Sequence, residues 1–171
     1  MKLARTLGGA AAGAAAAAVC TLQQPLDKRV FESDYDDVEL LGKLVTRGSE
    51  WPVVGVALHL QVGAAFGAAY SSLRPFVPGH PRVTALAAAL AEGLGTWPVV
   101  RLSYRYHPAR RELPTVDHGR ALLQVLWRHA LFGVVLGTLE ALINDRSADE
   151  PPAVPVSSNG HGNIETAVTV A

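Results

Sequence analysis

The sequence predicts an all-α membrane protein, a four-transmembrane-helix bundle built from two pseudo-repeated helical hairpins. Three observations carry this prediction. Hydrophobic residues make up 49% of the 171 residues. They gather in four apolar segments, each close to the roughly 20 residues that cross a bilayer as a helix. A pattern of one histidine and two glycines also occurs twice, in the second and fourth of these segments.

The four predicted spans cover residues 6–22, 51–73, 83–100 and 121–143. The first two contain no charged residue, so they lack the polar face of a helix in a soluble bundle. The first span has a rival interpretation as a cleaved signal peptide, because Lys2 and Arg5 precede it. The repeat favours its retention as the counterpart of the third span. We expect one membrane domain over residues 1–145 and a disordered, Pro-rich tail over residues 146–171.

The repeated pattern reads His59-x-x-x-Gly63-x-x-x-Gly67 in the second span and His129-x-x-x-Gly133-x-x-x-Gly137 in the fourth. Residues four apart lie on one face of a helix, so each pattern forms a stripe. Small residues in such a stripe let a second helix approach closely inside a bilayer. The two hairpins would then cross the membrane in the same sense, related by an axis along the membrane normal.

The hairpin arrangement places the two long connections, residues 23–50 and 101–120, on one side of the membrane. Trp51 and Trp97 reach the same side, where amphipathic rings prefer the interface. Nine Lys and Arg residues lie in the long connections and five on the opposite side, which favours cytoplasmic long connections. The basic residues before the first span weigh against that orientation.

The first connection is predicted to contain a short amphipathic helix at the membrane surface, over residues 34–47. Ser33 is its expected N-cap. A helix packed over the end of the bundle is the alternative. Asp34, Asp36 and Asp37 are expected to form a solvated start of this helix.

Five polar residues fall inside the predicted spans at similar depths: His59, Gln61, Glu92, Arg128 and His129. Ionisable groups are costly in lipid, so we expect this cluster to face the bundle interior, with Glu92 paired to Arg128 or a histidine. We interpret it first as polar contacts that fix helix packing in a structural or assembly protein. The alternative is a small transporter or proton-coupled channel, because Glu and His exchange protons.

A second alternative is a haem electron carrier, in which His59 and His129 would bind the iron from both sides. Otherwise no cofactor is predicted, and two histidines without further ligands make a poor zinc site. No serine or cysteine has a recognisable base partner, and no phosphate-binding loop is present in the sequence. We therefore expect no enzymatic activity.

The expected partners are the lipid bilayer and further copies of the chain in a homo-oligomer. The net charge is zero, so bulk electrostatics does not point to nucleic acid. The strings Gln24-Pro25-Leu26-Asp27-Lys28-Arg29 and Trp127-Arg128-His129, with the four-segment layout, resemble small bacterial multi-pass integral membrane proteins of unknown function. This resemblance implies a location in the plasma (inner) membrane and assigns no activity or site residue.

Overall fold

The computed structural model describes residues 2–148, with side chains described for residues 3–144. Over this range the protein is helical and contains no strand. Its elements are α1 (Lys2–Phe31), α2 (Asp37–Val45), α3 (Trp51–Leu73), the 3-10 turn η1 (Arg74–Phe76), α4 (Pro81–Tyr106) and α5 (His118–Ala148). Four helical stretches are long and apolar enough to cross a membrane: Leu3–Phe31, Trp51–Phe76, Pro81–Tyr106 and His118–Asn144. The all-α class and the four candidate spans are thus confirmed.

The helices extend beyond the predicted spans. α1 continues through Pro25 to Phe31 instead of ending near residue 22, and α4 continues through Pro98 to Tyr106. α5 reaches Ala148, so the predicted tail begins inside a helix and its remainder lies outside the described residues. The N-cap of α2 is Asp36, not Ser33, since its carboxylate accepts a hydrogen bond from the Glu39 N–H.

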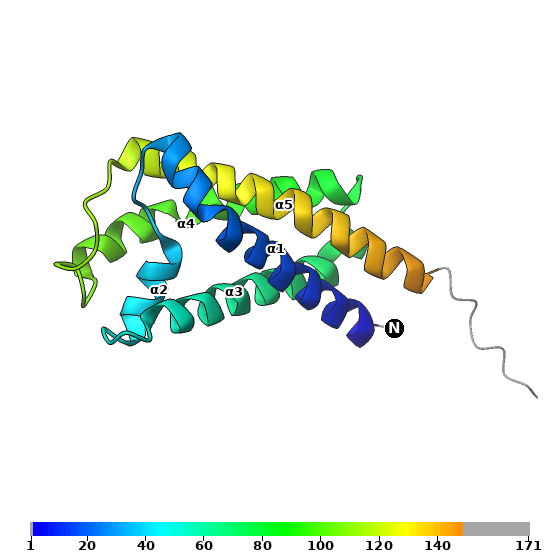
Figure 1. Ribbon diagram of the computed structural model, residues 1–171. Coiled ribbons are helices and arrows are strands. Elements are labelled where there is room, and N and C mark those ends of the chain that lie inside the picture. Colours follow the sequence, from blue (N-terminus) through cyan, green and yellow to red (C-terminus); the bar gives the residue numbers. More distant parts are fainter. Residues whose placement is uncertain (1, 149–171) are drawn as a thin grey trace, which may run out of the picture.

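The four long helices pack in the order α3, α1, α5 and α4 (Figure 1). α1 contacts both α3 and α5, and α5 contacts α4. Within the described residues, α3 and α4 do not form a packed pair. α2 lies against the first half of α3, near the C-terminal end of α1. The bundle is therefore an open arc whose two outer helices, α3 and α4, are not packed against each other.

The glycines of the repeated pattern lie at the closest helix contacts. A Cβ at Gly67 would sit 2.1 Å from the carbonyl oxygen of Gly9 on α1. A Cβ at Gly133 or Gly137 would sit 2.7 Å from a Cα of α4. Each glycine pair thus faces the other helix of its own predicted hairpin, with no space for a side chain. This packing accounts for the glycine spacing, while the internal repeat itself stays a prediction.

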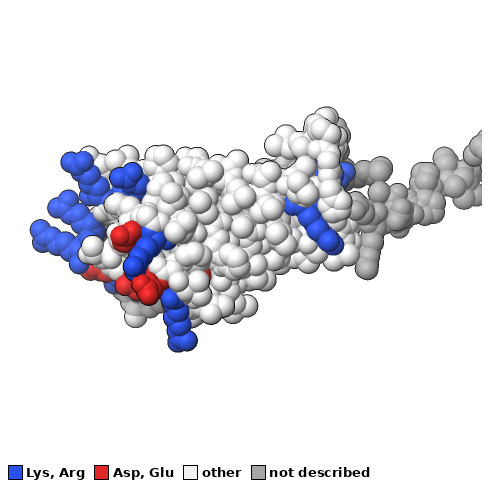
Figure 2. All heavy atoms as spheres, turned by 90° about the horizontal axis from the view of Figure 1, so that it is seen from above, with Lys and Arg blue, Asp and Glu red and all other residues white. Residues whose placement is uncertain are grey.

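Charged side chains gather at the two ends of the molecule on the face that Figure 2 shows, with an uncharged band between them. Large apolar side chains are also exposed on the long helices, among them Val53, Val62, Val83 and Leu94. Such a surface is compatible with lipid contact, because acyl chains provide the apolar surroundings that water does not. We refer to the end that carries α2 as the α2 end.

Gly67→Ala should destabilise the protein, although alanine favours an ordinary helix interior by about 1 kcal/mol over glycine. The added methyl group meets the backbone of α1, which can yield only if α1 and α3 separate. Gly95→Ala on α4 is the matched control, because no atom lies within 4 Å of its Cβ position. Circular dichroism in detergent should show a lower thermal midpoint for Gly67→Ala than for Gly95→Ala. Equal midpoints would contradict close packing at Gly67.

Candidate functional site

A small cavity lies between α3 and α4, towards the α2 end of the bundle, with a volume of about 90 Å³. Since one water needs roughly 10–15 Å³ of such space, several fit. The polar part of the lining consists of Cys20, Asp37, His59, Glu92, Arg128 and His129. The apolar part consists of Ala17, Val62, Gly63, Phe66, Ala89 and Phe132. All five α-helices contribute, so the cavity joins groups distant in the sequence.

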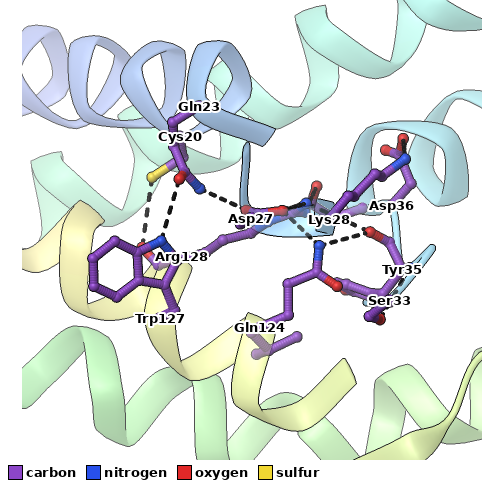
Figure 3. A network of polar contacts seen from close by, with 12 residues as sticks. Cys20, Gln23, Asp27, Lys28, Ser33, Tyr35, Asp36, Gln124, Trp127 and Arg128 are labelled. Atoms are coloured by element: carbon purple, nitrogen blue, oxygen red, sulfur yellow. Dashed lines mark hydrogen bonds and ion pairs between the residues drawn. The ribbon is translucent and has the colours of Figure 1, made fainter. Parts of the chain in front are cut away.

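Asp27, a fully buried carboxylate on α1, binds the cavity residue Arg128 (Figure 3). Arg128 donates to it from Nε at 2.5 Å and from Nη2 at 2.9 Å. The side-chain amides of Gln23 and Gln124 donate at 2.5 and 2.6 Å. Four donors thus satisfy both oxygens of Asp27, as a buried carboxylate requires. This network joins α1 to α5.

Arg128 also joins these helices to α2. Its Nη1 donates to Asp37 Oδ1 at 2.7 Å, and its guanidinium lies 5.7 Å from the centre of the Tyr35 ring. Burial raises the pKa of Asp37, but the charges of Arg128 and His59 outweigh burial and hold that pKa below its usual value. Burial raises the pKa of the Tyr35 phenol well above its usual range, so this ring stays neutral. Asp37 is therefore an ionised carboxylate at the cavity, not part of a solvated helix start.

His129 and Glu92 form a second polar contact, between α5 and α4. His129 Nε2 lies 2.7 Å from Glu92 Oε2, and His129 Nδ1 lies 2.7 Å from the carbonyl oxygen of Val125. A carbonyl oxygen only accepts, so Nδ1 must donate its proton there. The short contact between Nε2 and Glu92 then requires one further proton, carried by either partner. This pair therefore holds one exchangeable proton beside the cavity.

Gly93 makes room for the ring of His129. A Cβ at Gly93 would lie 2.7 Å from Cγ of His129 and 2.9 Å from its Nδ1. The imidazole therefore packs flat against the backbone of α4, one residue from its partner Glu92. This close approach fixes the position of the ring relative to the carboxylate.

His59 and Asp37 form a third contact, between α3 and α2. His59 Nδ1 lies 3.7 Å from Asp37 Oδ2, within the range of an ion pair when the imidazole is protonated. Both side chains line the cavity, and they are 18% and 25% exposed, so neither is fully buried. Asp37 thus lies between the fixed charge of Arg128 and the titratable ring of His59.

Four of the five sequence-predicted site residues line this cavity: His59, Glu92, Arg128 and His129. Gln61 is exposed on α3 and does not line it. Glu92 pairs with His129 and Arg128 pairs with aspartates. Sequence reasoning missed Asp27, Asp37 and Gly93 as parts of the site. Asp27 lies two residues after Pro25 and Asp37 stands among other acids, so both resembled connection residues. Gly93 matched no repeated spacing.

Both histidines proposed for a haem line the same cavity. Both ring nitrogens of His129 have protein partners, so iron ligation would require the loss of the Glu92 or Val125 contact. The geometry therefore adds no support to the haem alternative.

No family model, curated protein or solved structure matches the chain. The inferences about its function consequently rest on the residues of the cavity and on the fold that positions them.

Proposed function

We propose that the protein is a small proton-coupled membrane transporter and not an enzyme. The observation that supports this function most is the convergence of two imidazole–carboxylate contacts on one cavity among the candidate membrane helices. They are His129–Glu92 at 2.7 Å and His59–Asp37 at 3.7 Å. Glu and His side chains in a membrane interior are the groups that take up and release protons at physiological pH.

The access of these groups also favours proton exchange. The side chains of His129 and Glu92 are 26% and 38% exposed, whereas those of Arg128 and Asp27 are 5% and 0% exposed. A contact that only holds helices together is best fully enclosed, as Asp27–Arg128 is. A proton-exchanging group must instead stay accessible, as the partly exposed His129–Glu92 pair does.

A structural or assembly role is the second candidate function, and the Asp27 network favours it. This network joins α1 to α5 with four donors on one carboxylate, and Arg128 extends it to α2. It needs no substrate to explain it. The two candidates differ in the role of the pairs His129–Glu92 and His59–Asp37. Transport requires these pairs to gain and lose protons, whereas a structural role does not.

The test is a proton flux assay with the purified full-length protein in liposomes containing a pH-sensitive dye. We expect the wild-type protein to carry protons after an acid pulse, and Glu92→Gln to reduce this flux to the level of empty liposomes. Glutamine keeps the size of the side chain but cannot titrate. Glu112→Gln, in an exposed connection, is the matched control and should retain the flux.

Gly93→Ala provides a second variant, which leaves every titratable group in place. Its methyl group should displace the His129 ring from Glu92 and lower the flux while the protein still folds. If wild-type and empty liposomes give the same flux, the transport proposal is wrong. If the variants then lose only thermal stability, the structural candidate stands.

A further inference from the structure

The charges around the cavity do not balance without protons. The cavity and its wall contain three carboxylates, Asp27, Asp37 and Glu92, and one guanidinium, that of Arg128, which pairs with Asp27 and Asp37. Two additional positive charges make this group neutral, and two imidazoles are in place to carry them. His129 lies against Glu92, and His59 lies near Asp37.

The other polar groups nearby do not alter this count. On α1 the thiol of Cys20 donates to the carbonyl oxygen of Arg128 and is neutral, and Gln23 and Gln124 carry no charge. Lys28 is paired with Asp36 at 2.7 Å, and these two charges cancel. The cavity is therefore neutral with two bound protons and carries one net negative charge after it loses one. A net charge is costly inside a membrane, so a bound cation would favour the release of a proton.

The apolar part of the cavity indicates which kind of cation fits. The rings of Phe66 and Phe132 lie edge to face, with their centres 5.5 Å apart, and both line the cavity. Aromatic faces attract ammonium groups, and quaternary ammonium ions are recognised by such rings. Val62 and Ala89 complete an apolar wall that suits alkyl groups better than a hydrated metal ion. The lining thus supplies both carboxylates and aromatic and alkyl contacts.

We propose that the cavity binds a monovalent organic ammonium ion in exchange for one proton from an imidazole–carboxylate pair. This inference rests on the proposed transport function and names its second substrate class. One cation enters and one proton leaves, so the charge of the cavity is unchanged. The open side between α3 and α4 provides a route for a cation with an apolar substituent to enter from the bilayer.

The experiment is a calorimetric titration of the purified full-length protein in detergent with tetramethylammonium chloride. Titrations at several pH values, in buffers of different ionisation enthalpy, give both the affinity and the number of protons released. For one-for-one exchange we expect the affinity to rise with pH by up to about tenfold per unit, with release approaching one proton per cation. Sodium chloride at equal ionic strength is the control and should give neither signal.

Phe66→Leu combined with Phe132→Leu removes the aromatic faces and leaves every titratable group in place. We expect this variant to bind tetramethylammonium at least about tenfold more weakly, because it lacks the aromatic faces that attract an ammonium group. Unchanged affinity in a folded variant would overturn the assignment of the aromatic rings to cation binding.

The two proposals fail in different ways. If the wild-type protein carries protons but does not bind tetramethylammonium at any pH, the ammonium proposal is wrong and the transport proposal stands. A sodium signal equal to that of tetramethylammonium would also overturn the ammonium class. If there is neither flux nor binding, both proposals are wrong.

Discussion

Asp27→Asn is expected to destabilise the protein by about 3–5 kcal/mol, the usual cost of breaking a buried ion pair from one side. Four donors surround the Asp27 carboxylate, two of them from Arg128. An asparagine replaces one acceptor oxygen with an NH₂ group, which would face donors and leave the guanidinium with less compensating charge. The change should lower the thermal midpoint in detergent and the yield of folded protein.

Asp34→Asn is the matched control, since Asp34 is exposed in the connection between α1 and α2 and lies outside the network. A double variant, Asp27→Leu with Arg128→Met, tests the cause of the effect. It removes both charges of the pair, so it should be less destabilising than Asp27→Leu alone. The recovery should be incomplete, because Asp37 also loses its contact with Arg128. If the double variant is less stable than Asp27→Leu alone, an unpaired charge is not the cause.

Hydropathy alone predicted the spans because lipid-facing helices are apolar on most of their surface. The middle of the second, third and fourth spans satisfies this condition, as the exposed Val62, Leu94 and Val134 illustrate. Helix ends need not satisfy it, since polar residues there can find partners within the protein. α1 therefore continues beyond residue 22, with Gln23 and Asp27 bound to side chains of α5. A hydropathy sum over one segment contains no information about such partners on another helix.

The sequence predicted those site residues that are unusual within their own segment. It missed those whose role depends on a partner in another segment. Glu92 and His129 stand out because each interrupts an apolar span. Asp37 does not stand out, because it lies in an acidic run where a solvated helix start is the ordinary interpretation. Its role depends on α2 lying against α3 near Arg128, which is a tertiary feature. Gly93 is similar, because its function depends on the neighbouring ring of His129.

Asp37→Asn should change how the stability of the protein depends on acid. The pKa of Asp37 is below its usual value of 3.8, because Arg128 and His59 outweigh the effect of burial. A carboxyl group with a lowered pKa in the folded state binds fewer protons there than in the unfolded state. Its contribution to stability is therefore complete above the unfolded pKa and is lost as the pH falls through the folded pKa.

The asparagine variant cannot titrate at this position, so the two proteins should differ most at neutral pH and become alike in acid. Thermal unfolding in detergent between about pH 7 and pH 2 should give a lower midpoint for the variant at neutral pH. The wild-type midpoint should then fall more steeply below about pH 4, the range in which an aspartate becomes protonated. Parallel curves would mean that Asp37 does not titrate against Arg128. Since Arg128 contacts both Asp27 and Asp37, a steeper wild-type curve would show that the docking of α2 depends on a charge inside the bundle.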